Sequence, residues 1–147
     1  SISFRSIFRC GAEVTRVRKM LRNDMDAYKA RAEVVRHAEV YRGAFAISIC
    51  PADKIESPTI VGAQAADELL NIVGIKASFV LTEYQGKIYV SSRSIDEINV
   101  QKIMERLGGG GHLNMAGCQL RDCTVSQAQR IIEDTIDEML EEGDIEE

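Results

Sequence analysis

The stretch KASFVLTEYQGKIYVSS, residues 76–92, decides the fold. It contains two runs rich in β-branched and aromatic residues, Lys76 to Tyr84 and Lys87 to Ser92, and such runs are typical of strands. The two residues between them are Gln85 and Gly86, and a two-residue connection that contains glycine favours the tight turn of a hairpin. We therefore predict a β-hairpin over residues 76–92.

The residues before this hairpin predict one more strand and a helix. Residues 44–50 form a short, largely apolar run that is typical of a buried strand. Ser57 followed by Pro58 is a favourable helix start, and the apolar spacing extends the predicted helix to Val73. Gly74 stands just beyond, where a glycine commonly ends a helix.

The residues after the hairpin predict two helices and a short strand. Asp96 is expected to cap a helix that ends near Leu107, because four apolar residues of this segment share one helical face. Residues 116–120 predict a short strand, and residues 126–140 predict a final amphipathic helix. The fold class is therefore α/β of the α+β type, with a mixed sheet of about five strands flanked by helices.

The first 42 residues predict a helical linker in front of this domain. Phe4, Ile7 and Phe8 have helical spacing, and Gly11 is expected to end that first helix. A second short apolar stripe follows, and a longer amphipathic helix is predicted from residue 24 to residue 40. We divide the chain into residues 1–42 and residues 43–147.

Composition indicates a protein that folds without disulfides. The chain has 147 residues, of which 45% are hydrophobic, and it lacks tryptophan, so its core is expected to be aliphatic. Its four cysteines form no CxxC pair, and no apolar run has the length of a signal peptide or membrane span. These features favour a reducing, cytoplasmic setting without direct membrane contact.

Charge is distributed unevenly along the chain, although the net value is -5. Residues 1–42 hold ten basic and five acidic side chains, whereas residues 123–147 hold one basic and nine acidic side chains. The basic beginning suits an anionic ligand or partner, and the acidic end disfavours nucleic acid. Most of these charges are equally consistent with solvated helix faces.

The run Gly108-Gly109-Gly110-Gly111-His112 is the strongest local signal for function. One glycine after a helix is an ordinary C-cap, but four in a row exceed that need and favour close approach of a ligand to the backbone. Successive backbone N–H groups can form a concave nest for a phosphate, and His112 can donate a hydrogen bond beside it. A flexible connector is the alternative.

A second candidate cluster is Ser91-Ser92-Arg93-Ser94, at the end of a predicted strand. Arginine offers a planar fork of donors for phosphate, and the serines add hydroxyl groups. A surface arginine followed by a turn serine explains the same residues. Asn99 can bind a ribose or base, or it can cap the helix.

Motifs for a hydrolytic or metal centre do not occur in the sequence. The two histidines, His37 and His112, lie far apart, and His37 is expected to face solvent in the linker. There is no HExxH, DHH, GxSxG or Walker pattern, so the sequence predicts no catalytic residues and no metal ligands.

Residues 91–120, SSRSIDEINVQKIMERLGGGGHLNMAGCQL, resemble the motif core of the DHH-associated domain (subfamily 1) of the DHH phosphoesterases. The likeness is greatest to the membrane-anchored cyclic-di-AMP phosphodiesterases of bacteria. Residues 10–35 resemble the end of the preceding DHH domain and its connecting helix. In one departure, Met115-Ala116-Gly117 stands where many relatives have a double alanine, which alters the pocket floor.

The resemblance implies a substrate-binding domain of a larger, manganese-dependent phosphodiesterase that cleaves cyclic-di-AMP to linear pApA. Manganese would be bound by the DHH domain, a part of the parent that this chain lacks, so this stretch alone is expected to be inactive and to need no cofactor. Its partners would be a cyclic or linear dinucleotide and that DHH domain, on the cytoplasmic side of a membrane-anchored parent. The implied substrate-binding residues are Ser92, Arg93, Ser94, Asn99, Gly108, Gly109, Gly110, Gly111, His112 and Ala116.

Three alternatives remain open at this point. In the first two, the parent would be an oligoribonuclease or a 3′-phosphoadenosine phosphate phosphatase. In the third, the chain would be a non-catalytic RNA-binding module. The acidic C-terminal part and the lack of stacking aromatics near the glycine run disfavour the RNA module. Self-association into a homodimer through Phe4, Ile7 and Phe8 is a further expectation.

Overall fold

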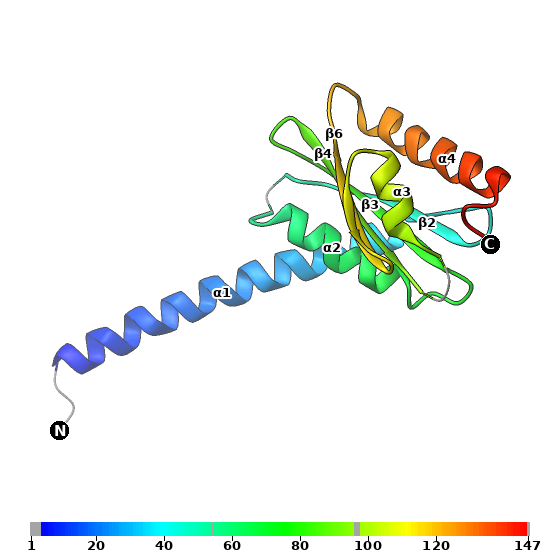
Figure 1. The fold of residues 1–147 in the computed structure, drawn as a ribbon. Helices are drawn as coiled ribbons and strands as arrows, with labels where there is room; N and C mark the ends of the chain where they lie inside the picture. Colours follow the sequence, from blue (N-terminus) through cyan, green and yellow to red (C-terminus); the bar gives the residue numbers. More distant parts are fainter. Residues whose placement is uncertain (1–3, 54, 96–97, 147) are drawn as a thin grey trace.

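The computed structural model describes residues 4–53, 55–95 and 98–146, with the backbone alone at 4–10 and 23. A sheet with helices on both faces forms the domain, and one long helix projects from it (Figure 1). The elements are α1 (Phe4–Arg36), β1 (Glu39–Tyr41), β2 (Phe45–Cys50), α2 (Pro58–Leu69), β3 (Ala77–Tyr84), β4 (Lys87–Ser94), α3 (Val100–Arg106), β5 (Gly110–His112), β6 (Met115–Leu120) and α4 (Val125–Glu142).

The sheet has six strands in the order β1-β2-β3-β4-β6-β5. Only β2 and β3 pair in parallel, and α2 forms the crossover between them. The other neighbouring strands are antiparallel. The predicted hairpin is confirmed: Tyr84 pairs with Lys87, and Gln85 and Gly86 both have positive φ (53° and 77°), as a type I′ turn requires.

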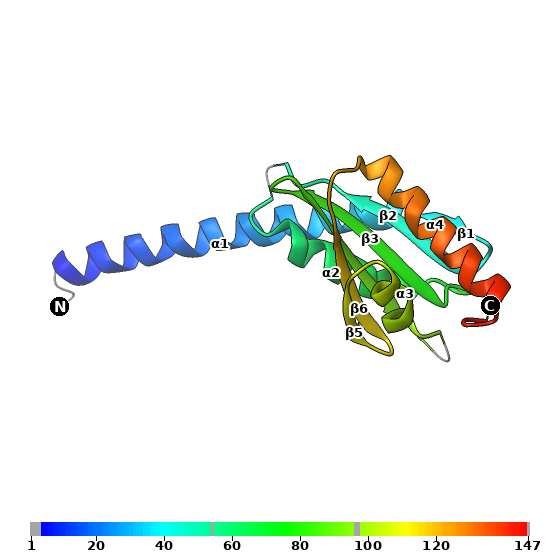
Figure 2. The same ribbon diagram turned by 45° about the horizontal axis from the view of Figure 1, so that its top comes forward.

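The two faces of the sheet are covered differently (Figure 2). Helices α3 and α4 pack on one face and enclose the larger core, to which Phe79 and Leu81 of β3 contribute. Helix α2 and the end of α1 pack on the other face over β2 and β3, where Val80 points. On this second side the strands β6 and β5 are left exposed, as shown by Met115, which is 52% exposed.

Helix α1 is one continuous element, so the prediction that Gly11 ends a first helix was wrong. An exposed glycine inside a helix costs only about 1 kcal/mol relative to alanine, and the arginine, lysine, methionine and leucine residues that follow are good helix formers. The helix also ends earlier than predicted, at Arg36. The side chains of Phe4, Ile7 and Phe8, invoked for self-association, lie outside the described residues.

Strand β1 was missed, because Glu39 and Val40 were assigned to the preceding helix and Tyr41 to no element. Its conformation is fixed by tertiary contacts that no local pattern reports. The hydroxyl of Tyr41 donates to the Asp137 carboxylate of α4 at 2.7 Å, and this bond raises the pKa of Tyr41 to about 12. The Nε of Arg42 lies 3.2 Å from the same carboxylate. The sheet therefore begins before residue 43.

The remaining helices agree with prediction in place but not in length. Helix α2 ends at Leu69 instead of Val73, because residues 70–72 form tighter i→i+3 turns. Helix α3 begins at Val100, and Asp96, its predicted cap, lies outside the described residues. Helix α4 is confirmed, with a capping box at Thr124.

Candidate functional site

The first half of the glycine run ends α3 in a Schellman motif. Gly108 has φ +83°, and its N–H donates to the carbonyl of Glu105 at 3.1 Å. The N–H of Gly109 donates to the carbonyl of Met104 at 2.8 Å. These two amides are therefore occupied by helix carbonyls, so Gly108 and Gly109 do not offer free N–H groups to the predicted phosphate nest.

The second half of the run is a strand, which the sequence did not predict because glycine has low strand propensity. Strand β5 pairs antiparallel with β6, so that Gly110 faces Gly117, Gly111 faces Ala116 and His112 faces Met115. The neighbouring strand supplies the hydrogen bonds that hold it extended.

Packing explains Gly109 and Gly111, and backbone conformation explains Gly108, but neither explains Gly110. A Cβ at Gly109 would lie 2.1 Å from the Gly117 oxygen, and one at Gly111 would lie 2.5 Å from the Cα of Ala116. Gly108 needs its positive φ. A Cβ at Gly110 would meet nothing within 4 Å, so its environment leaves open space above the backbone.

The register of β4, β6 and β5 brings several predicted residues to one surface, which we call the open face. It is the α2 side of these three strands. Because side chains alternate along a strand, two rows cross it, Ser91-Gly117-Gly110 and Arg93-Met115-His112, each given by the pairing of the three strands. Gly110, His112 and Arg93 therefore share this face, and Gly117 and Gly110 leave part of the first row without side chains.

Ser92, Ser94 and Ala116 lie on the opposite face of the sheet, toward α3 and α4. Ser92 is fully buried beside Phe79 and Ala116, and its hydroxyl has no hydrogen-bond partner among the described residues. The structure thus separates these three residues from the open face. The neighbour that shares the open face is Ser91, which belongs to the predicted cluster of residues 91–94 but was not among the implied substrate-binding residues.

Replacing Ser92 with alanine is expected to raise the free energy of unfolding by about 1 kcal/mol, because it removes a buried hydroxyl that lacks a partner. Urea unfolding of both proteins measures the difference. Nucleotide binding should not change. A loss of nucleotide affinity in this variant would show instead that the hydroxyl contacts a ligand.

Ser94 and Asn99 have roles inside the fold. The Ser94 hydroxyl donates to the carbonyl of Ile98 at 2.6 Å and accepts from the side-chain amide of Asn114 at 3.0 Å. Asn99 caps α3, because its side-chain oxygen accepts from the N–H of Lys102 at 3.3 Å. Of the two roles weighed for Asn99, the structure shows the cap.

Arg93 is oriented by two contacts on the open face. Its Nε lies 2.8 Å from a carboxylate oxygen of Asp67 on α2, and its Nη1 donates to the carbonyl of Ser92 at 2.9 Å. The side chain is only 12% exposed, whereas that of Asp67 is 60% exposed. Arg93 is therefore a positioned cation, although part of its charge is already balanced.

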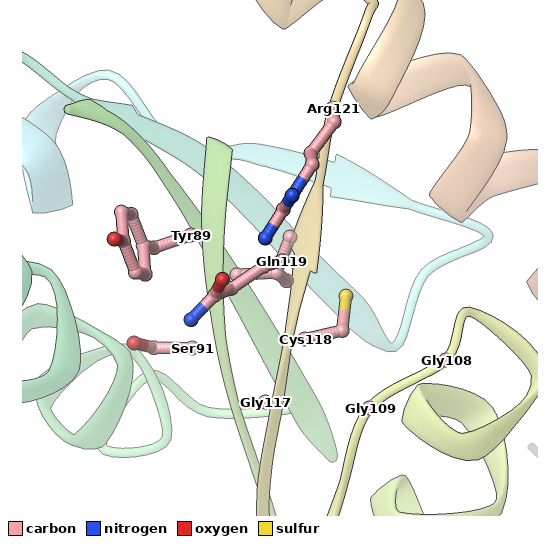
Figure 3. Close-up of a pocket in the computed structure, with 9 residues that line it drawn as sticks. Tyr89, Ser91, Gly108, Gly109, Gly117, Cys118, Gln119 and Arg121 are labelled. Atoms are coloured by element: carbon pink, nitrogen blue, oxygen red, sulfur yellow. The ribbon is translucent and has the colours of Figure 1, made fainter. Parts of the chain in front are cut away.

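A depression of about 510 Å³ adjoins the glycine run (Figure 3). It brings Gly108 and Gly109 together with residues that sequence reasoning missed. Its lining is Tyr89, Val90, Ser91, Gly108, Gly109, Gly117, Cys118, Gln119 and Arg121. Burial raises the pKa of the Cys118 thiol to about 12, so this cysteine is not a nucleophile at neutral pH.

The open face is basic although the chain is acidic overall. Strands β4 and β6 contain no aspartate or glutamate. Lys87 and Arg93 lie near the two ends of β4, both on its open side. Arg121 follows β6 and lines the depression. Three basic side chains therefore border the open face, and one of them, Arg93, is paired with Asp67. Local cations can attract anions even when the net charge is negative.

The parts of the chain that the structure describes contain no group of three or more His, Cys, Asp or Glu side chains suited to a metal ion. These residues therefore do not fit a manganese site. Among the same residues, no helix has both the length and the apolar character needed to cross a membrane. His37 lies beyond the end of α1, exposed, with Nε2 3.0 Å from Glu33.

Fold and open face together define a mixed α/β domain whose exposed sheet surface has glycine in its floor and basic side chains around it. The chain belongs to the DHHA1 domain family, whose model matches residues 44–142. This confirms the resemblance that the glycine run and its surroundings indicated.

Cyclic-di-AMP phosphodiesterases are among the curated relatives. The chain is 41% identical over 128 residues to PdeA of Listeria monocytogenes, which covers 86% of this chain and 19% of the relative. It is 38% identical over 135 residues to GdpP of Bacillus subtilis, which covers 90% of this chain and 20% of the relative. The chain thus spans about a fifth of the length of these proteins.

Solved structures share the fold at low identity. An exopolyphosphatase-related protein of Bacteroides fragilis aligns with a TM-score of 0.67 at 20% identity, over 77% of this chain and 34% of that one. The pGpG-specific phosphodiesterase PggH of Vibrio cholerae aligns with a TM-score of 0.55 at 16% identity, over 84% of this chain and 42% of that one. These matches support the fold assignment.

Proposed function

We propose that the open face holds the nucleotide substrate of a larger phosphodiesterase that hydrolyses cyclic-di-AMP to linear pApA. The support is the identity of 38–41% to PdeA and GdpP over most of this chain. Because the chain covers about a fifth of those relatives and its described residues do not fit a metal site, we assign manganese to the DHH domain of the longer protein. The residues of this chain bind and orient.

The observation that carries the proposal is the position of Gly110. It is the one glycine of the run whose missing side chain is not explained by backbone geometry or by packing. It lies on the open face beside Gly117, and Ser91 completes the row. A floor of this kind lets a phosphate or ribose approach the main chain closely, and that approach is what a side chain at residue 110 would prevent.

His112 and Arg93 supply the polar contacts in the adjacent row. His112 is exposed at the sheet edge, where its ring can donate a hydrogen bond to a phosphate oxygen. Arg93, held by Asp67, presents part of its guanidinium fork to the same surface. Hydrogen bonds to a charged group contribute more than neutral ones, so these two side chains set the affinity for the phosphate.

Helix α1 is proposed to connect this domain to the DHH domain of the same protein. Its outer part is exposed and carries an apolar stripe with helical spacing, formed by Val14, Val17, Leu21 and Met25. A stripe of this kind on a projecting helix suits a partner domain. By the same resemblance, we place the parent in the membrane with this part on the cytoplasmic side.

Calorimetric titration of the chain with pApA, cyclic-di-AMP and adenosine 3′,5′-bisphosphate tests the proposal. His112→Ala combined with Gly110→Val is expected to weaken dinucleotide binding by at least about tenfold, since a charge-assisted hydrogen bond and the approach to the backbone are both lost. His37→Ala, the other histidine, is the matched control and should bind normally.

Tighter binding of adenosine bisphosphate than of either dinucleotide would move the substrate assignment to the phosphatase alternative. Equal affinity of the double variant and the original chain would contradict the open face as the binding surface.

A further inference from the structure

A second group of polar and aromatic side chains lies on the open face, four residues along β6 from the row of His112. Tyr89 of β4 pairs with Gln119 of β6, and Arg121 is the first residue after β6. All three line the depression beside Gly108 and Gly109. In Figure 3 the Gln119 amide extends over β4 between Tyr89 and Ser91, and Arg121 extends toward Gln119.

The ring of Tyr89 is held in place from one side. The Tyr84 ring packs against it with 6.5 Å between centroids and an interplanar angle of 50°. Such aromatic contacts restrict the side chain, so a planar ligand that stacks on Tyr89 loses little further side-chain freedom. Tyr89 is half-buried, and its hydroxyl makes no hydrogen bond within the described chain.

Arg121 and Gln119 have polar groups available for a ligand. Both side chains are exposed, and neither has a hydrogen-bond or ion-pair partner within the residues that the structure describes. Arg106, by contrast, is bound by Glu142 and Asp144. An unpaired guanidinium, a free amide and an aromatic ring that line one depression match the donors and the stacking surface that a nucleotide requires.

We propose that Tyr89, Gln119 and Arg121 form a subsite for a second nucleotide, in which the base stacks on Tyr89 and the phosphate meets Arg121. Gln119 can donate to and accept from the edge of the base. The subsite rests on the proposed function, because Gly110 and His112 hold the first nucleotide. Four residues of strand separate the two rows by about 13 Å, a distance that suits two linked nucleotides better than one.

Titration of the chain with pApA and with adenosine monophosphate distinguishes this subsite from the first. Tyr89→Leu is expected to lower the affinity for pApA on the order of tenfold, because the stacking of the second base is lost. The affinity for adenosine monophosphate should stay within about twofold of the original value. Tyr89→Phe keeps the ring and should behave like the original chain. Arg121→Gln should lower the affinity for pApA and make that affinity less dependent on salt concentration.

Arg121→Gln alters an exposed side chain and should leave folding intact. It therefore still tests the subsite if Tyr89→Leu impairs folding. The subsite is overturned if pApA binds the original chain no more tightly than the mononucleotide, or if these variants keep full dinucleotide affinity. In either case binding of the mononucleotide that depends on His112 would leave the proposed function standing. If neither nucleotide binds, both proposals are wrong.

Discussion

Gly109→Ala is expected to lower the free energy of unfolding by about 3 kcal/mol, although alanine is ordinarily the mildest replacement for glycine. The added methyl group would lie 2.1 Å from the oxygen of Gly117 and 2.5 Å from the Cβ of Cys118. The first of these atoms belongs to the backbone of β6, so the strand itself must move. Urea unfolding measures the loss.

Gly110→Ala is the matched control for that substitution. Residue 110 has no atom within 4 Å of its missing side chain and no positive φ, so the change in stability should stay within about 0.5 kcal/mol. Equal losses at residues 109 and 110 would refute the separation of the run into structural glycines and one glycine on the ligand face.

The parts of the fold that could be predicted from sequence depend on local signals. The hairpin turn at Gln85 and Gly86, the strand at residues 45–50 and helix α4 are each specified by residues close in sequence. Strand β5 was not predictable in this way, because a glycine strand exists only through its pairing with β6. Strand β1 likewise depends on Tyr41 and its bond to Asp137, ninety-six residues away.

Of the predicted site residues, the structure brings Arg93, Gly110 and His112 to the open face, an arrangement that the sequence did not predict. Motif reasoning selected Ser92 and Arg93 together, yet adjacent residues of a strand point to opposite faces. Ser91 and Arg93 share the open face, whereas Ser92 enters the core. Alternation was visible in the sequence, but which face stays uncovered depends on where α2 packs. Tyr89, Gln119 and Arg121 were missed for the same reason, and they supply the aromatic group that seemed to be lacking near the glycine run.

Ser94→Ala is expected to lower the free energy of unfolding by about 2 kcal/mol, because it leaves the buried carbonyl of Ile98 without its donor and removes the acceptor of the Asn114 side-chain amide. The Ser94 hydroxyl, 4% exposed as part of its residue, bonds the carbonyl of Ile98 and the side-chain amide of Asn114, and it lies 3.2 Å from the carbonyl of Leu113. The substitution therefore loosens the turn between β5 and β6.

Thermal and urea unfolding measure that loss of stability. Ser91→Ala is the control, because the Ser91 hydroxyl makes no hydrogen bond in the described structure. This control should change the free energy of unfolding by less than about 0.5 kcal/mol. His112 directly precedes the turn that Ser94 fixes. Weaker nucleotide binding in Ser94→Ala would therefore reflect displacement of His112. Saturating nucleotide should restore part of the lost stability, because the nucleotide binds only the folded chain. If Ser94→Ala keeps full stability but loses nucleotide affinity, the hydroxyl is a direct ligand contact and the structural role assigned to it is wrong.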